Sequence, residues 1–227
     1  MGLDMYLNRM PRHKGATPYD IDKIESYMDY MDRLQDPKSN ANKYSMKEWC
    51  GVEESEIPME LLEFYKPFFA VKYPDWDEEH KYGYGRIMDQ VAYWRKANAI
   101  HDWFVNNVQD GEDDCEYHDE VTKEILEELL CVCETVLESS KLIEGKIENG
   151  YHYNDNGEKV YNYEDGKYIE DPSVAKALLP TTEGFFFGGT DYDEWYYEDI
   201  KYTANKIKEI LETTDFETQM IYYISSW

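Results

Sequence analysis

The sequence has few cysteines and no long apolar run, and each absence excludes a class of protein. Its four cysteines are too few for the disulfide scaffold of a 227-residue chain, so free thiols in a reducing compartment are expected. No apolar stretch approaches the roughly 20 residues of a membrane span, and no signal peptide is recognisable. We therefore expect a cytoplasmic protein that does not bind membranes.

Recognised catalytic motifs are also missing. The sequence contains no Ser-His-Asp order, nucleophile elbow, His-Glu-x-x-His or phosphate-binding P-loop motif. Cys115 and His118 have the spacing of half a zinc site without the other half, and the acidic run at 110–116 departs from a calcium loop at Cys115 and Val121. Pairs of acidic residues do not indicate a catalytic site, because such pairs are inevitable in a chain with 49 acidic residues. These absences indicate a protein that is not an enzyme and uses no cofactor or metal.

Basic residues are scarce, and their scarcity is uneven along the chain. The 49 acidic residues against 23 basic ones give a net charge of -26. Residues 1–50 hold eight of each sign, whereas residues 101–150 hold 15 acids and three bases. A field of this sign repels nucleic acid, so direct nucleic-acid binding is not expected. Aromatic residues reach 16%, which indicates a folded domain with an acidic exterior rather than a disordered chain.

Strand patterns occupy both ends of the chain, and helix patterns lie between them without regular β-α-β alternation. The turn signal Asn156-Gly157 predicts a hairpin. Helices are predicted over residues 21–35, 45–51, 58–65, 86–108, 120–140, 173–179 and 193–213, strands over 2–7, 184–188 and 216–224, an extended segment over 66–74 and a break at 82–85. The sequence thus predicts a single α+β domain over residues 1–227. Several long helices pack on a small, mostly antiparallel sheet that includes both chain termini, with an inserted β-hairpin at 145–172.

Two stretches, at 93–104 and 180–193, combine aromatic, basic, amide and glycine residues at a density that folding alone does not require. Rigid aromatic faces with a few fixed polar groups are the composition of a binding site. On the helix predicted over 86–108, steps of three and four residues place an indole, an amide and an imidazole on one face, beside two bases that can bind phosphate. The predicted ligand-binding residues are Trp94, Arg95, Lys96, Asn98, His101, Gly188 and Gly189.

Each of these residues also has a structural interpretation. In that interpretation the predicted helix is buried, with Trp94 in the core, His101 hydrogen-bonded there and Arg95 paired with a nearby acid. The glycine turn can cradle an anion with its backbone N–H groups, but the acids beyond it, Asp191 or Asp193, favour capping of the next helix. The phenylalanines at 185–187 are expected in a core strand.

Four segments resemble a family of small, uncharacterised bacteriophage and prophage proteins. They are the opening MGLDMYL, the block YWRKANAIHDWF at 93–104, GFFFG at 184–188 with the following Tyr192-Asp193, and the final SSW. The resemblance touches both ends and two internal blocks, so it covers the whole domain. It implies a viral accessory protein in a bacterial cytoplasm and carries no established activity. Accessory phage proteins of this size often oppose host defence, as inhibitors, mimics or sponges for signalling nucleotides.

Three functions follow from these observations. In the first, a phage-encoded, non-catalytic counter-defence protein sequesters a nucleotide-like small molecule in an aromatic and arginine pocket. In the second, the acidic surface of residues 101–200 imitates nucleic acid and docks on a basic groove of a host defence protein. In the third, His101, His118 and nearby acids form a metal-dependent hydrolase. Exposed aromatic residues are additionally compatible with a homodimer.

Overall fold

The computed structural model of the chain describes residues 2–71, 85–184 and 186–227. Its contacts divide the chain into two compact units. The larger unit consists of Met1–Asn8, Gln90–Phe216 and Ile221–Trp227, and the smaller unit consists of Arg9–Asp89 and Glu217–Met220. The predicted single domain stays a prediction, since a division by contacts does not test whether the two units fold together.

The architecture is α+β, as the sequence predicted, and strands from both ends of the chain share one sheet. That sheet has three strands in the order β4-β1-β7, formed by β1 (Asp4–Pro11), β4 (Asp89–Arg95) and β7 (Gln219–Ser226). On β1, Met5 and Leu7 are completely buried, which matches the alternation of a strand with one face on the core. The predicted strands at the two chain ends are therefore confirmed.

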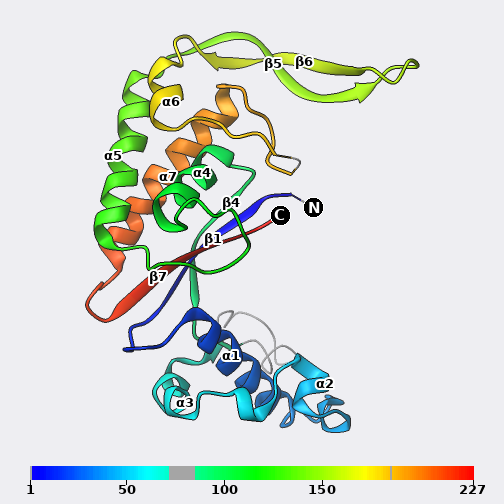
Figure 1. The fold of residues 1–227 in the computed structure, drawn as a ribbon, viewed down its shortest axis with the longest axis vertical. Helices are drawn as coiled ribbons and strands as arrows, with labels where there is room; N and C mark the ends of the chain where they lie inside the picture. Colours follow the sequence, from blue (N-terminus) through cyan, green and yellow to red (C-terminus); the bar gives the residue numbers. More distant parts are fainter. Residues whose placement is uncertain (1, 72–84, 185) are drawn as a thin grey trace. The chain divides into compact units, whose positions relative to one another are not determined.

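Helices of the larger unit pack through apolar stripes at helical spacing. They are α4 (Asn98–Val108), α5 (Lys123–Ser139), the short α6 (Ser173–Leu178) and α7 (Glu194–Thr213). Figure 1 shows α5 and α7 side by side. Their facing stripes are fully or almost fully buried and comprise Leu126, Leu129, Cys133 and Val136 of α5 with Ile200, Ala204, Ile207 and Ile210 of α7.

The predicted hairpin is present and consists of β5 (Leu142–Tyr153) and β6 (Lys159–Ile169). Gly157 takes a positive φ of 77° in its turn, as an Asn-Gly turn requires. The pairing shifts between Glu148 and Tyr151, where a bulge lies. The distal half of the hairpin is exposed and extends away from the helices (Figure 1).

The described residues of the smaller unit form three α-helices and a short two-stranded sheet. The helices are α1 (Pro18–Arg33), α2 (Met46–Cys50) and α3 (Met59–Tyr65), followed by β2 (Ala70–Val71), which pairs with β3 (Gly85–Arg86). The N-cap of α1 is Thr17, and Asp20 completes a capping box three residues later. Single-turn 3-10 helices lie at Ala41–Lys43, Glu54–Glu56 and Lys66–Phe68.

Two predicted elements were wrong. The segment 86–108 is not one helix, because its first part forms strands and Lys96, with a φ of 61°, separates β4 from α4. Ala92 and Trp94 are buried between exposed neighbours, which is the period of a strand. The described residues of the predicted strand at 184–188 form a turn, closed by a hydrogen bond from Phe187 N to Gly184 O.

Part of the predicted extended segment at 66–74 is the 3-10 helix Lys66–Phe68. Residues 72–74 of that segment, most of the break predicted at 82–85 and Phe185 lie outside the described residues. None of the helices that the structure describes is long and apolar enough to cross a membrane.

Candidate functional site

The larger unit contains a cavity of about 760 Å³, a size typical of small-molecule sites. One part of its wall is the junction of β4 and α4, from Arg95 to Ile100. The loop before α7 supplies a second part, the first two turns of α7 a third, and the bulged part of the hairpin a fourth. Segments far apart in the sequence therefore meet around one space.

Five of the seven predicted ligand-binding residues line this cavity, namely Arg95, Lys96, Asn98, Gly188 and Gly189. The structure brings them together from the β4–α4 junction and from the loop before α7. Trp94 and His101 do not line it, and both are buried in the core.

Arg95 and Lys96 are exposed neighbours whose side chains reach the same place. Successive residues of a strand point to opposite faces, but the left-handed backbone of Lys96 breaks that alternation. A methyl group added at Gly2 would lie 3.2 Å from Lys96 Cε and 3.6 Å from an Arg95 guanidinium nitrogen. The two cationic groups therefore lie close together beside Gly2, at the edge of the cavity.

The first turn of α4 adds partial positive charge to the same part of the wall. Residues 97–100 line the cavity, and the helix has neither a side-chain N-cap nor an acid in its first turn. The N–H groups of Asn98 and Ile100 donate to the carbonyl oxygens of Lys96 and Ala97, so the helix N-terminus favours an anion nearby through its dipole. Two side-chain cations and a helix N-terminus thus converge at one end of the cavity.

Asn98 holds the loop before α7 against α4. It is almost fully buried, and its Nδ2 donates to the carbonyl oxygens of Phe187, at 3.1 Å, and Gly189, at 2.8 Å. Its Oδ1 accepts a hydrogen bond from Thr182 N at 3.0 Å. The amide that was predicted to bind a ligand therefore positions the cavity wall instead.

The two predicted glycines, Gly188 and Gly189, belong to the same loop. Gly188 has a φ of 90°, and a Cβ there would lie 3.1 Å from the Cβ of Lys96, so a larger residue would be strained and would crowd Lys96. Gly189 supplies the carbonyl oxygen that Asn98 binds. The helix cap expected at Asp193 is confirmed, since its Oδ1 accepts from the backbone N–H groups of Trp195 and Tyr196.

Trp94 belongs to the core, which corrects its expected place in a pocket. Its side chain lies on the buried face of β4, and its Nε1 donates to Thr203 Oγ1 on α7 at 2.8 Å. Phe104 and Tyr202 lie against the indole. The indole is therefore used to join the sheet to α7.

His101 is likewise a satisfied core histidine. Its Nδ1 lies 2.7 Å from the Tyr223 hydroxyl and its Nε2 lies 3.0 Å from Asp113 Oδ1. The Trp227 indole donates to the same carboxylate oxygen. Burial lowers the pKa of His101, although the charge of Asp113 opposes the shift. The imidazole therefore links α4, the following loop and the C-terminal strand.

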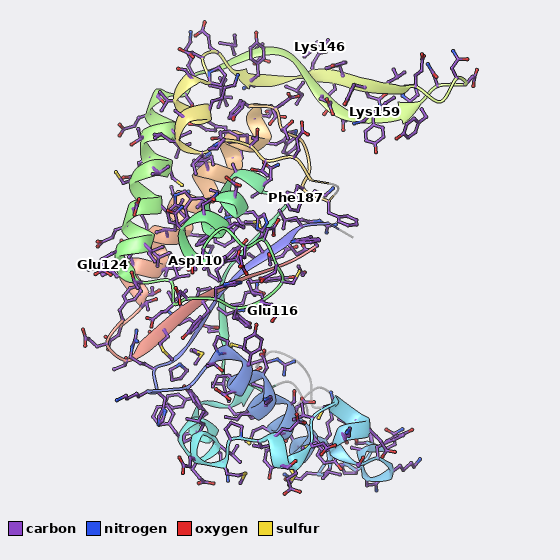
Figure 2. All side chains as sticks on the ribbon, viewed as in Figure 1. Asp110, Glu116, Glu124, Lys146, Lys159 and Phe187 are labelled. Atoms are coloured by element: carbon purple, nitrogen blue, oxygen red, sulfur yellow. The ribbon has the colours of Figure 1, made fainter. Side chains whose placement is uncertain are left out.

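Sequence reasoning missed the aromatic group that does line the cavity. Trp195, in the first turn of α7, is 64% exposed, and Tyr151 of the hairpin is 48% exposed. Lys159, labelled in Figure 2, also lines the cavity, and its Nζ lies over the rings of Tyr151 and Tyr161 at 4.1 and 4.4 Å. The helical pattern could have revealed Trp195, because it falls outside the buried stripe that starts at Tyr196.

Carboxylates occupy the α7 end of the cavity. Burial raises the pKa of Asp199 to about 7, and the neighbouring Asp193 adds to the shift. Burial also raises the pKa of Asp193, against the effect of the two N–H groups it caps. The cavity therefore has a cationic end at Arg95 and Lys96 and an acceptor-rich end on α7.

No family model, curated protein or solved structure matches this chain.

Metal ligands do not gather in the described part of the chain. Within residues 2–71, 85–184 and 186–227, no three His, Cys, Asp or Glu side chains are placed to hold one ion. His101 binds Asp113, and His118 binds Asp114 at 2.9 Å. The two histidines of the hydrolase hypothesis are therefore engaged in separate hydrogen-bonded pairs.

The burial of His101 predicts a pH dependence of stability. Its pKa is lowered in the folded protein, so as the pH falls below the unfolded value of about 6.5 the unfolded chain binds a proton first and unfolding is favoured. We expect the free energy of unfolding of the wild type to fall relative to that of His101→Gln between about pH 8 and pH 5. The difference is at most about 1.4 kcal/mol for each pH unit between the two pKa values.

Denaturant unfolding across this pH range measures the effect, with the less buried His118→Gln as the matched control. A stability difference between wild type and His101→Gln that is constant across the range would contradict a neutral, buried imidazole.

Proposed function

We propose that the protein is a non-catalytic binding protein that sequesters an anionic, nucleotide-like small molecule in this cavity. The proposal rests on which basic residues of the larger unit have an ion-pair or aromatic partner and which do not. Of its eleven bases, seven form ion pairs with carboxylates, namely Lys123, Lys141, Lys146, Lys167, Lys201, Lys206 and Lys208. Lys159 and Lys176 lie over tyrosine rings. The remaining two are Arg95 and Lys96, which have neither kind of partner among the described residues.

Unpaired neighbouring cations are unexpected in a chain with more than twice as many acids as bases. Lysines and arginines near so many carboxylates acquire partners readily, as the other bases of this unit do. A guanidinium offers a fork of donors that fits a phosphate, and an ammonium adds charge. The N-terminus of α4, which has no acid in its first turn, lies in the same part of the wall, so its dipole also favours an anion there.

The composition of the cavity wall supports binding rather than chemistry. The described lining residues include no cysteine, histidine or serine, and their acidic side chains come without a histidine or thiol partner in the wall. The wall does contain the bare indole of Trp195 and the ring of Tyr151, on which a flat group can stack. An anion site beside an aromatic surface matches the chemistry of a nucleotide.

The resemblance to phage proteins supports an infected bacterial cell as the setting. A protein that removes a signalling nucleotide from such a cell would oppose host immunity without catalysing a reaction. The biological role proposed here is therefore counter-defence by sequestration.

Nucleotides should stabilise the protein, and Arg95 should be required. A ligand that binds only the folded state at 100 times its Kd adds about 2.7 kcal/mol, which appears as a rise in Tm. Replacing Arg95 by Ala removes a charged donor, so we expect affinity to fall by about tenfold to a hundredfold. Thermal unfolding with nucleoside monophosphates, followed by calorimetric titration, measures both.

Lys43→Ala in the smaller unit is the matched control, because Lys43 is also exposed and has no ion pair among the described residues. If no nucleotide raises the Tm of the wild type, or if Arg95→Ala binds as tightly as the wild type, the proposal is wrong.

Lys96 offers a test in which stability and binding change in opposite directions. A lysine with a φ of 61° is strained by roughly 1 kcal/mol, which glycine avoids. Lys96→Gly should therefore stabilise the fold while weakening nucleotide binding about tenfold. Asp110→Gly is the control, because Asp110 also has a positive φ, of 51°, and does not line the cavity. Equal affinities of the two variants would mean that the ammonium of Lys96 does not bind the ligand.

Docking on a basic partner is the second candidate, and the distribution of exposed carboxylates favours it. Asp110, Glu116 and Glu124, labelled in Figure 2, belong to the loop after α4 and the first turn of α5, and all three are exposed. Glu127 and Glu128 continue this acidic surface along α5. A row of exposed carboxylates can oppose the basic groove of a nucleic-acid-binding protein.

Such docking should depend strongly on salt. Immobilised protein should retain nucleic-acid-binding proteins of the bacterial host at low salt and release them near 1 M salt, where the screening length is about 3 Å. Replacing Glu124, Glu127 and Glu128 together by Gln should reduce the retention. Retention that persists at high salt, or that the triple replacement leaves unchanged, would count against mimicry.

A further inference from the structure

One face of α7 presents an aromatic ring and two carboxylates to the cavity. Trp195, Glu198 and Asp199 are three and four residues apart, so they are neighbours on the helix surface, and all three line the cavity. The buried stripe of the helix runs instead through Tyr196 and Ile200. These three side chains are thus not needed for the packing of α7 on the core.

The indole of Trp195 has no partner in the described part of the chain. No ring, cation or hydrogen-bond acceptor contacts its side chain there, and its backbone N–H binds the cap residue Asp193. Trp195 is 64% exposed, which is unusual for the largest apolar side chain. A bare indole beside a cavity is a plane on which a nucleobase can stack, a contact that contributes about 1–3 kcal/mol for a base.

The Asp199 carboxylate also lacks a donor. Among the described residues, the Thr203 hydroxyl donates to the main-chain oxygen of Asp199, and none donates to its carboxylate. The side chain is half-buried, and this burial raises its pKa to about 7. A desolvated carboxylate without donors is unfavourable, so N–H groups of a ligand would be bound strongly there. Above pH 7 the group can accept hydrogen bonds but cannot donate them.

The donor pattern of the nucleobase then decides which nucleotide fits. Two carboxylate oxygens match two adjacent N–H donors. Guanine presents such a pair on one edge, its N1–H and its exocyclic amino group at C2. On the corresponding edge, adenine, cytosine and uracil place a donor next to an acceptor, and an acceptor would face the carboxylate unfavourably.

We propose that the ligand is a guanine nucleotide, with its base stacked on Trp195, its two N–H donors on Asp199 and its phosphate at Arg95 and Lys96. This assignment rests on the proposed function, because it takes the cationic end of the cavity as the phosphate site. It adds the identity of the base and the residue that selects it. The cavity volume of about 760 Å³ is adequate for a bound nucleotide.

Calorimetric titration at pH 8 with GMP, IMP, AMP and inorganic phosphate tests the assignment on the wild-type protein. IMP differs from GMP by the loss of the 2-amino group alone, so we expect GMP to bind about tenfold more tightly or better. AMP should bind more weakly than GMP by at least the same factor. GMP should also quench the fluorescence of the wild type more than that of Trp195→Phe.

Replacing Asp199 by Asn should change the preference rather than simply abolish binding. The amide keeps one acceptor and gains one donor, which matches the N1–H and C2 carbonyl of xanthine instead of guanine. We expect Asp199→Asn to bind GMP about tenfold more weakly than the wild type and to prefer XMP. Asp155→Asn, an exposed aspartate of the hairpin turn that does not line the cavity, is the isosteric control.

The outcomes separate the two proposals. Equal affinities for GMP and IMP, both lost in Arg95→Ala, would overturn the guanine assignment and leave the anion site intact. Unchanged GMP preference in Asp199→Asn would overturn the role of Asp199. If the wild type binds no nucleotide and no phosphate, the proposed function fails and this inference fails with it.

Discussion

The side chain of Asn98 is the point on which the cavity depends. One buried amide binds three backbone groups of the loop before α7, and these bonds hold the loop against the start of α4. The amide is fully used in this way, and in the first turn of α4 the backbone N–H groups of Asn98 and Ile100 donate to the carbonyl oxygens of Lys96 and Ala97. The same bonds place Gly188 against Lys96, which confines the lysine side chain to the cavity edge. A single residue thus fixes the loop before α7 as part of the cavity wall.

The acidic exterior and the cationic cavity end act over different distances. At physiological salt the field of exposed charges is screened over about 8 Å, so the net charge of -26 slows the approach of an anion more than it weakens an anion already bound. A bound anion experiences chiefly the groups that touch it, here Arg95, Lys96 and the N-terminus of α4. The global charge is therefore no argument against a local anion site. The carboxylates on α7 favour ligands that carry N–H donors in addition to an anionic group.

Much of the architecture could be predicted from local patterns, and the exceptions share a cause. The terminal strands, the hairpin and the cap at Asp193 follow from alternation, an Asn-Gly turn and capping preference. The segment 86–108 does not, because Trp94, Asn98 and His101 are spaced for a helix while Ala92 and Trp94 equally fit a strand. Pairing with β1 decides between the two, and β1 lies some 80 residues earlier in the chain. Periodicity over seven residues cannot contain that information.

The candidate site was likewise predictable only where the local sequence determines the position of a side chain. Composition identified a block dense in aromatic and basic residues, and Arg95, Lys96 and Asn98 of that block do meet at a cavity. It could not show that Trp94 and His101 face inward, because their partners Thr203 and Tyr223 are more than 100 residues away.

The stacking surface comes instead from Trp195, whose position off the buried stripe of α7 is a local signal, and from Tyr151 of the hairpin. A left-handed backbone that glycine would occupy without strain carries a lysine, and this conformation turns the ammonium to the side where Arg95 already lies. Strain retained at an exposed position, where packing does not require the side chain, is most simply explained by what the charge binds.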